Sequence, residues 1–350
     1  MRIRRTLPIF LTVILIVAAV TIAVQLRKQA PPEVARLLPG GDAFFYVNLG
    51  RIRRANGGKE LPAVSHDPEY ERFISQTGFE FERDLDEAAF AVHYPGNWPG
   101  GGTGESAPEP RFSEVLKGEF HGERLTAYLR QIAQAVENYQ SIDIYTLRVE
   151  GRSVRVAVLN ADLVAASNHD DPAVIRGIVD RSKRLASPFG GPALLRQFYK
   201  HVQFASLAWA VARIDPAALA GSSWTSLFTA PATLVVSGSY LSALHLNLKA
   251  DSVHVRAEAF TKSPEEARAI IDKVNVFLAL THTGETEVGM HGADPDVKAF
   301  FDSIAAKQAD DRAVVNASVP FGFLRKMLAE PGPEVPQASQ PSAEPAVKSR

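Results

Sequence analysis

The sequence contains no cysteine, which excludes several kinds of chemistry at the outset. Disulfides, thiolate zinc sites, iron–sulfur clusters and a cysteine nucleophile all require that residue. The 350 residues also lack a surplus of either charge, because 38 Lys and Arg stand against 39 Asp and Glu. A formal charge of −1 provides no electrostatic basis for binding nucleic acid, so we expect no nucleic-acid partner.

Sequence motifs of the common catalytic sites are missing as well. There is no Ser-x-x-Lys, no Gly-x-Ser-x-Gly and no His-Glu-x-x-His. Two weak groups of metal-ligand types occur, His169-Asp170-Asp171 and His291 with Asp294 and Asp296, but helix caps and turns explain both. We therefore predict no catalytic, cofactor-binding or metal-binding residue, while an enzyme with a dispersed site stays open.

One apolar run near the N-terminus is long enough to cross a bilayer. It extends without a charge from Thr6 to Leu26, and a helix of that length spans about 30 Å, the thickness of a bilayer core. A cleaved signal peptide is the competing interpretation, but its apolar core is usually about 7–15 residues. We favour an uncleaved anchor. Arg2, Arg4 and Arg5 precede it, which favours a cytoplasmic N-terminus and a body in the periplasm or outside.

The charge of the remaining chain differs from that of the anchor region. Residues 1–28 hold five cations and no acidic residue, which leaves 33 Lys and Arg against 39 Asp and Glu. The exported part is thus expected to carry a formal charge of −6.

Hydrophobic periodicity predicts alternating strands and helices beyond the anchor. Strands are expected at 43–49, 87–94, 111–120, 142–149, 154–160, 163–167, 204–214, twice within 232–250, at 253–260 and at 312–319. Amphipathic helices are expected at 69–78, 121–136, 173–185, 264–282 and 296–308.

Composition divides the chain into five parts. We expect the cytoplasmic end and anchor at 1–28, a linker at 29–41, α+β subdomains at 42–200 and 201–330, and a disordered tail at 331–350, where five prolines occur.

Two similarities suggest an internal duplication. The segment 171–181 (DPAVIRGIVDR) resembles 294–304 (DPDVKAFFDSI), and a strand runs into a long helix both at Phe120 and at Phe260. The alternative is that Asp-Pro commonly starts helices. Long alternating strands with amphipathic helices between them predict an antiparallel-rich α+β fold, as one two-lobed body or two similar subdomains.

The segment Leu-Pro-Gly-Gly-Asp-Ala-Phe-Phe-Tyr-Val-Asn-Leu at 38–49 follows the anchor and leads into the α+β repeats. In this general plan the chain resembles uncharacterised membrane-anchored bacterial proteins that are classed by a domain of unknown function. The resemblance implies a place in the bacterial envelope and carries over no functional residue.

Strand alternation points to one polar row. If a hairpin turned through residues 250–253, His245 would face Glu258 and Asn247 would face Arg256 on the side away from the core. Such a His–carboxylate pair is an acid/base candidate, although a solvated sheet face gives the same pattern. We favour the solvated face and keep His245, Arg256 and Glu258 as candidate binding residues.

Trp98 is the fourth candidate, because it stands in a Gly- and Pro-rich loop at 95–110 where no core is available to bury it. An exposed aromatic of this kind is a plausible contact for a partner, although packing onto the nearest sheet is the simpler interpretation. The sequence as a whole favours an anchored envelope protein that binds or scaffolds other envelope proteins, with an anchored hydrolase as the alternative.

Overall fold

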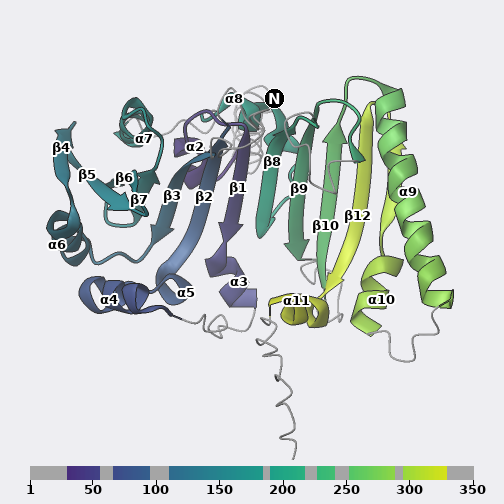
Figure 1. Ribbon diagram of the computed structural model, residues 1–350, viewed down its shortest axis with the longest axis horizontal. Coiled ribbons are helices and arrows are strands. Elements are labelled where there is room, and N and C mark those ends of the chain that lie inside the picture. Colours follow the sequence, from purple (N-terminus) through teal and green to yellow (C-terminus); the bar gives the residue numbers. More distant parts are fainter. Residues whose placement is uncertain are drawn as a thin grey trace, which may run out of the picture.

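Twelve strands form one antiparallel sheet that runs through the whole molecule (Figure 1). The structure is a computed structural model that describes residues 30–55, 66–94, 110–183, 190–216, 227–240, 252–287 and 295–328. The strands are β1 (Ala43–Asn48), β2 (Leu85–His93), β3 (Arg111–Gly118), β4 (Ala135–Tyr139), β5 (Ile142–Val149), β6 (Arg152–Val158), β7 (Leu163–Ser167), β8 (Ala208–Ile214), β9 (Ala232–Tyr240), β10 (Ser252–Phe260), β11 (Ala305–Ala309) and β12 (Arg312–Pro320). Their order is β11-β12-β10-β9-β8-β1-β2-β3-β7-β6-β5-β4. The predicted antiparallel-rich α+β class is confirmed.

Helices connect the strands and pack on both faces of the sheet. They are α2 (Glu33–Leu37), α3 (Leu49–Ala55), α4 (Pro68–Thr77), α5 (Phe81–Asp84), α6 (Gly122–Ile132), α7 (Ala173–Lys183), α8 (Ala193–Phe198), the 3-10 helix η1 (Tyr199–His201), α9 (Pro264–Glu287), α10 (Pro295–Asp302) and α11 (Phe321–Leu328). Among the described residues, none of these helices combines the length and apolar character that crossing a membrane requires. The anchor predicted at Thr6 to Leu26 lies outside the described residues.

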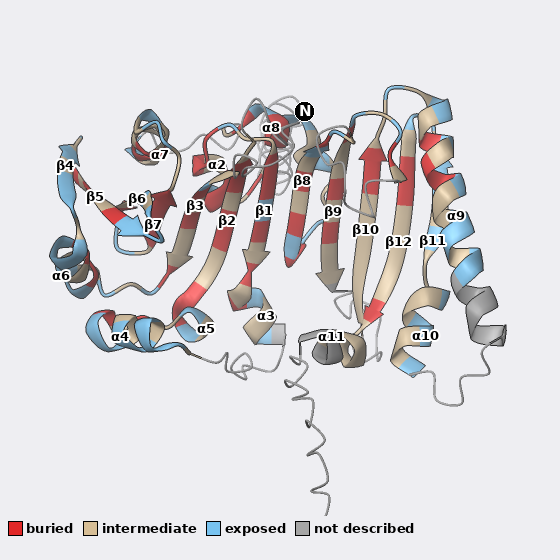
Figure 2. Cartoon of the chain, in the orientation of Figure 1, coloured by how far each residue is buried: buried red, intermediate tan, exposed pale blue. Residues whose placement is uncertain are grey.

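The main core lies where α2, α7 and α8 cover one face of the sheet. Ile175, Ile178 and Val179 of α7 pack with Phe44 of β1 and Val115 of β3 in this cluster. On the opposite face, α6 forms a second cluster with β5 and β7. All five residues of β7 are buried as a result, which explains its uninterrupted apolar sequence (Figure 2).

The segment predicted as a linker at 29–41 belongs to this core. Val34, Ala35, Leu37 and Leu38 are at most 1% exposed and pack within the main cluster. The prolines within this segment suggested a connector, but three of these apolar residues lie in α2, Leu38 follows it directly, and all four side chains are buried.

The sheet has two parts that join through β1 and β8. These strands pair antiparallel, with Phe45 opposite Ala210. Each part begins with a three-strand meander, β1-β2-β3 or β8-β9-β10, and continues into an amphipathic helix, α6 or α9. In each part, a later strand then pairs with the third strand of the meander. These pairs are β7 with β3 and β12 with β10. The connectivity therefore repeats.

The predicted correspondence between 171–181 and 294–304 does not follow this repeat. Helix α7 comes after the returning strand β7, whereas α10 comes before β11 and β12. Asp-Pro starts α10 and precedes α7 because it is a good helix start, which is the alternative interpretation of the similarity.

Two predicted helices end early and give way to edge strands. Helix α6 ends at Ile132, and Ala135–Tyr139 pairs with β5. Helix α10 ends at Asp302, and Ala305–Ala309 pairs with β12. These two strands close the opposite ends of the sheet. Their helical periodicity was misleading because a partner strand, rather than local propensity, decides their conformation.

Candidate functional site

A groove of about 850 Å³ lies where the two parts of the sheet meet. The register places Tyr46 of β1 beside Trp209 of β8, Asn48 of β1 beside Glu87 of β2, and Glu87 beside Lys117 of β3. Directly paired residues share a face of a sheet, so these five side chains line one surface of the groove. The start of α2 and residues 199–206 supply its other lining residues.

Three aromatic side chains form one wall. The ring of Trp209 stacks on that of Tyr46, with centroids 5.4 Å apart and planes at 18°, and it meets Tyr199 in an edge contact at 5.4 Å. Trp209 is only 4% exposed, yet its Nε1 atom has no hydrogen-bond partner among the described residues. A buried indole N–H usually has one, and leaving it unsatisfied costs about 1–3 kcal/mol.

Polar groups at the C-terminal end of β1 fix the geometry of this wall. Asn48 Nδ2 donates to the Tyr46 hydroxyl at 2.9 Å, and Asn48 Oδ1 accepts from the backbone N–H of Arg51 at 2.7 Å. Asn48 thereby caps α3. Burial, reinforced by the carboxylate of Glu87, raises the pKa of Tyr46 above its usual range, and burial raises the pKa of Tyr199 to about 12. Both phenols therefore stay neutral at physiological pH.

A second hollow of about 400 Å³ continues the first, since Asn48, Glu87 and Lys117 line both. We call the two together the junction groove. Five cationic residues line it, against three acidic ones. The cations are Arg51, Arg53, Arg54, Lys117 and Lys200, and the acids are Glu33, Asp86 and Glu87. The groove thus carries a local surplus of positive charge on a chain whose residues beyond 28 sum to −6.

Residues 199–206 form the border of the groove on the side of β8. Phe204 is 71% exposed there, and its neighbour Ala205 has a φ of 58°, a left-handed conformation that is costly for a residue with a side chain. Gln203 ties the segment to β9, because its Oε1 accepts from the Ser239 hydroxyl at 2.7 Å. An exposed phenylalanine is therefore held at the mouth of the groove.

The structure places only two of the four predicted binding residues. Trp98 and His245 lie outside the described residues. The predicted hairpin register is wrong, because β10 pairs with β9 and β12: Glu258 lies opposite Val235 and Val314, and Arg256 lies opposite Ser237 and Asn316. Strand β9, which ends at Tyr240, is the strand that pairs with β10. It thus takes the position beside β10 that was predicted for residues 244–249.

Glu258 is also not on a solvated face, since it is 2% exposed. Its carboxylate accepts from Arg256 Nε at 2.7 Å and from Arg312 Nη1 at 3.2 Å, and His201 Nδ1 lies 3.7 Å away. Burial lowers the pKa of His201, while Glu258 opposes that shift. Because two guanidinium groups hold the carboxylate, this cluster is best understood as a structural ion pair network.

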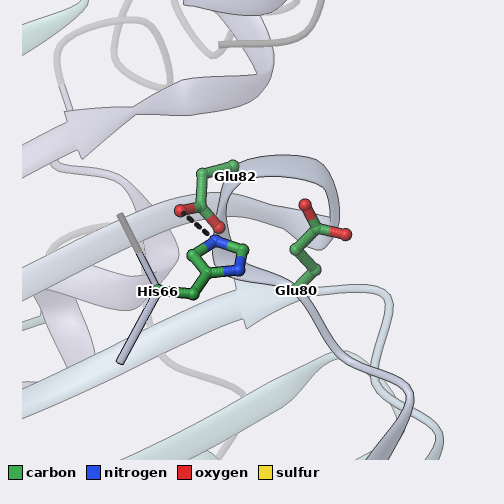
Figure 3. Close-up of side chains that lie close together, drawn as sticks. All are labelled: His66, Glu80 and Glu82. Carbon is green, nitrogen blue, oxygen red and sulfur yellow. Dashed lines mark hydrogen bonds and ion pairs between the residues drawn. The ribbon is translucent and has the colours of Figure 1, made fainter. Parts of the chain in front are cut away.

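A third group, His66, Glu80 and Glu82, offers metal-ligand atoms within 4.8 Å of one another (Figure 3). Other contacts explain it. His66 Nδ1 lies 2.7 Å from Glu71 Oε1, which raises the pKa of His66 and favours the imidazolium that pairs with Glu82 at 3.3 Å. Glu80 accepts from Arg83 at 2.9 Å. A proton on His66 supplies the positive charge that a metal ion would bring.

Structural contacts also explain the group His169-Asp170-Asp171. Asp170 pairs with Arg111 at 3.0 Å, and Asp171 Oδ1 accepts from the N–H of Ala173 at 2.8 Å as the cap of α7. In the second group of this kind, His291 and Asp294 lie outside the described residues.

Sequence reasoning missed the junction groove entirely. Tyr46 and Trp209 fall within two predicted strands, 43–49 and 204–214, and Lys117 falls within a third, 111–120. No short motif contains them, because only the pairing of β1 with β8 brings them together.

Comparison with known proteins gives little guidance. No protein-family model matches the sequence, and no curated protein matches it. Crystal form III of TP0453 is similar over 85% of this chain and 98% of that chain, with a TM-score of 0.43 and 8% identity. Crystal form I of TP0453 covers 85% and 97%, with a TM-score of 0.41 and 9% identity. A likeness of this degree carries no argument about function.

Proposed function

We propose that this chain is an extracytoplasmic binding protein of the bacterial envelope, held at the cytoplasmic membrane by residues 6–26, and that the junction groove is its ligand site. The strongest support is the indole N–H of Trp209, a residue that lines the groove. This N–H is buried and has no acceptor among the described residues. The larger hollow of the groove, about 850 Å³ in volume, is in the range of small-molecule sites, about 300–1,000 Å³. A bound molecule that presents an oxygen to Trp209 removes the cost of the unpaired donor.

Binding fits the described residues better than hydrolysis does. The carboxylate predicted for acid/base chemistry, Glu258, is clamped by Arg256 and Arg312. The groove itself holds neutral phenols, two side-chain amides and more cations than carboxylates, which are groups that recognise a ligand. Catalysis would in addition need a nucleophile or base with a pKa near the working pH.

A photo-crosslinking amino acid at the mouth of the groove tests the proposal without knowledge of the ligand. Full-length protein with benzoylphenylalanine in place of Phe204 is irradiated in native membranes, and adducts are identified by mass. We expect an adduct at this position and none at Lys307, an exposed control position on β11. The same membranes should retain the chain after a carbonate wash. Equal labelling at both positions, or none, would reject the groove as the site.

A further inference from the structure

We propose that the ligand of the junction groove is an anionic membrane lipid, with its headgroup among the cations and its acyl chain along the apolar border. This inference rests on the proposed function, because it requires both the groove as the site and residues 6–26 as the anchor.

Charge is the first reason. Arg51 and Lys200 form no ion pair with any described residue, and Lys117 is 3.6 Å from Asp162 and 3.9 Å from Glu33, which is beyond hydrogen-bond distance. By contrast, Arg53 is fully engaged, with Asp86 at 2.7 Å and the Leu85 carbonyl at 2.7 Å. Arg51 and Lys200 are thus available to an anion, and Lys117, which is ion paired with both carboxylates, adds a third positive charge to the groove. A phosphate takes several charge-assisted hydrogen bonds from such groups.

The apolar surface of the groove suits an acyl chain better than a sugar. Both Tyr46 and Tyr199 contact the ring of Trp209, so Trp209 does not present an open face on which a sugar could stack. What the border does present is Phe204, 71% exposed, with Val202 nearby in the lining. An alkyl chain requires only this kind of apolar contact. The indole N–H of Trp209 then has an ester or phosphate oxygen to bond.

The third reason is distance along the chain. Ala30 lines the groove and lies only four residues after Leu26, the end of the proposed anchor. At 3.3–3.6 Å per residue, a fully extended chain places the two at most about 14 Å apart. The lining of the groove therefore begins within about one headgroup layer of the bilayer surface, where the lipid headgroups lie. A lipid can reach the groove without crossing bulk water.

A lipid photo-probe tests the class of ligand. Full-length protein is reconstituted into phosphatidylcholine nanodiscs that contain a trace of diazirine-bearing phosphatidylglycerol or, as the matched probe, diazirine-bearing phosphatidylcholine. Labelling is read by mass spectrometry of the peptides that contain residues 199–209. We expect the phosphatidylglycerol probe to label them at least fivefold more. Lys117→Met and Arg51→Met should each reduce that labelling severalfold, whereas Lys307→Met, a surface control of the same kind as Lys117→Met, should not.

Soluble glycerol phosphate separates a lipid site from a simple phosphate site. If the acyl chain contributes, millimolar glycerol phosphate leaves the labelling unchanged, and full competition would show that only free phosphate is recognised. Equal labelling by both lipid probes, or no effect of the two groove substitutions, would overturn the lipid proposal. A non-lipid adduct at position 204 in native membranes would also overturn it while leaving the proposed binding function standing, whereas no adduct would reject both.

Discussion

The two parts of the sheet are stabilised differently. From β1 to β7, helices cover both faces, and the main apolar cluster connects α2, α7 and α8 to these strands and extends onto β8 and β9 of the second part. From β8 to β12, α9 packs on one face through Ile270 and Ile271, while the other face carries the buried charge cluster around Glu258. The first part thus relies on apolar burial and the second on ion pairs as well. The junction groove lies between them, on a face where the polar residues of both parts meet.

Apolar truncation should separate the two parts most strongly. Ile178 of α7 is fully buried, whereas Ile271 of α9 is 7% exposed on a helix whose outer side is exposed (Figure 2). Ile178→Ala should lower the free energy of unfolding by an amount near the upper end of about 2–5 kcal/mol. Ile271→Ala should lower the free energy of unfolding by less. Urea denaturation measures both.

Native-state hydrogen exchange of the unmodified protein tests the same difference between the two parts of the sheet. Amides of β10 and β12 should open at lower free energy than those of β3 and β7, because fewer apolar side chains cover them. Equal protection in the two parts, together with equal costs of the two substitutions, would show that the sheet is one uniform unit.

Local signals in the sequence predicted much of the first part. Asp67 accepts from the backbone N–H groups of Glu69 and Tyr70, and Gly78 takes a φ of 75° at the end of α4, as a capping residue and a terminal glycine should. Strand β1 also alternates in burial from Phe44 to Asn48. Such elements are decided by neighbours in the sequence.

What the sequence did not show depends on distant partners. The solvated face predicted for Glu258 is wrong, because Arg312 and His201, which contact its carboxylate, come from other segments of the chain. Strands β4 and β11 exist only through their pairing with β5 and β12. The groove is missed for the same reason, since Trp209 and Tyr46 meet across the junction.

Glu258 provides the second test of the comparison. Glu258→Gln keeps the size of the side chain but removes the charge that two guanidinium groups contact. We expect a loss of about 1–3 kcal/mol in the free energy of unfolding, less than for a fully buried pair, because Arg256 and Arg312 are partly exposed. Glu119→Gln, on an exposed residue, should change it by at most about 0.5 kcal/mol. A loss no larger than that of the control would mean that the cluster does not stabilise the second part.

The smallest expected effect is a difference between two histidines. The hydrogen bond from Glu71 raises the pKa of His66, and burial lowers that of His201. Below the unfolded pKa of about 6.5, protonated His66 is favoured by folding, and this stabilisation is lost as pH rises through its folded pKa. His201 has the opposite sign: folding favours its neutral form, so its contribution is present above about pH 6.5 and is lost as pH falls toward its folded pKa.

Titration followed by NMR of ¹³C-labelled histidine rings measures both values, with His66→Gln and His201→Gln spectra for assignment. His66 should titrate at higher pH than His201. Glu71→Gln should move the pKa of His66 down and leave His201 unchanged, because Glu71 contacts only the former of the two. Since His201 faces Glu258, Glu258→Gln should lower the pKa of His201 further and leave His66 unchanged. If Glu258→Gln instead left the pKa of His201 unchanged, the carboxylate would exert no charge effect on that ring, and the ion pair account of the second part would fail.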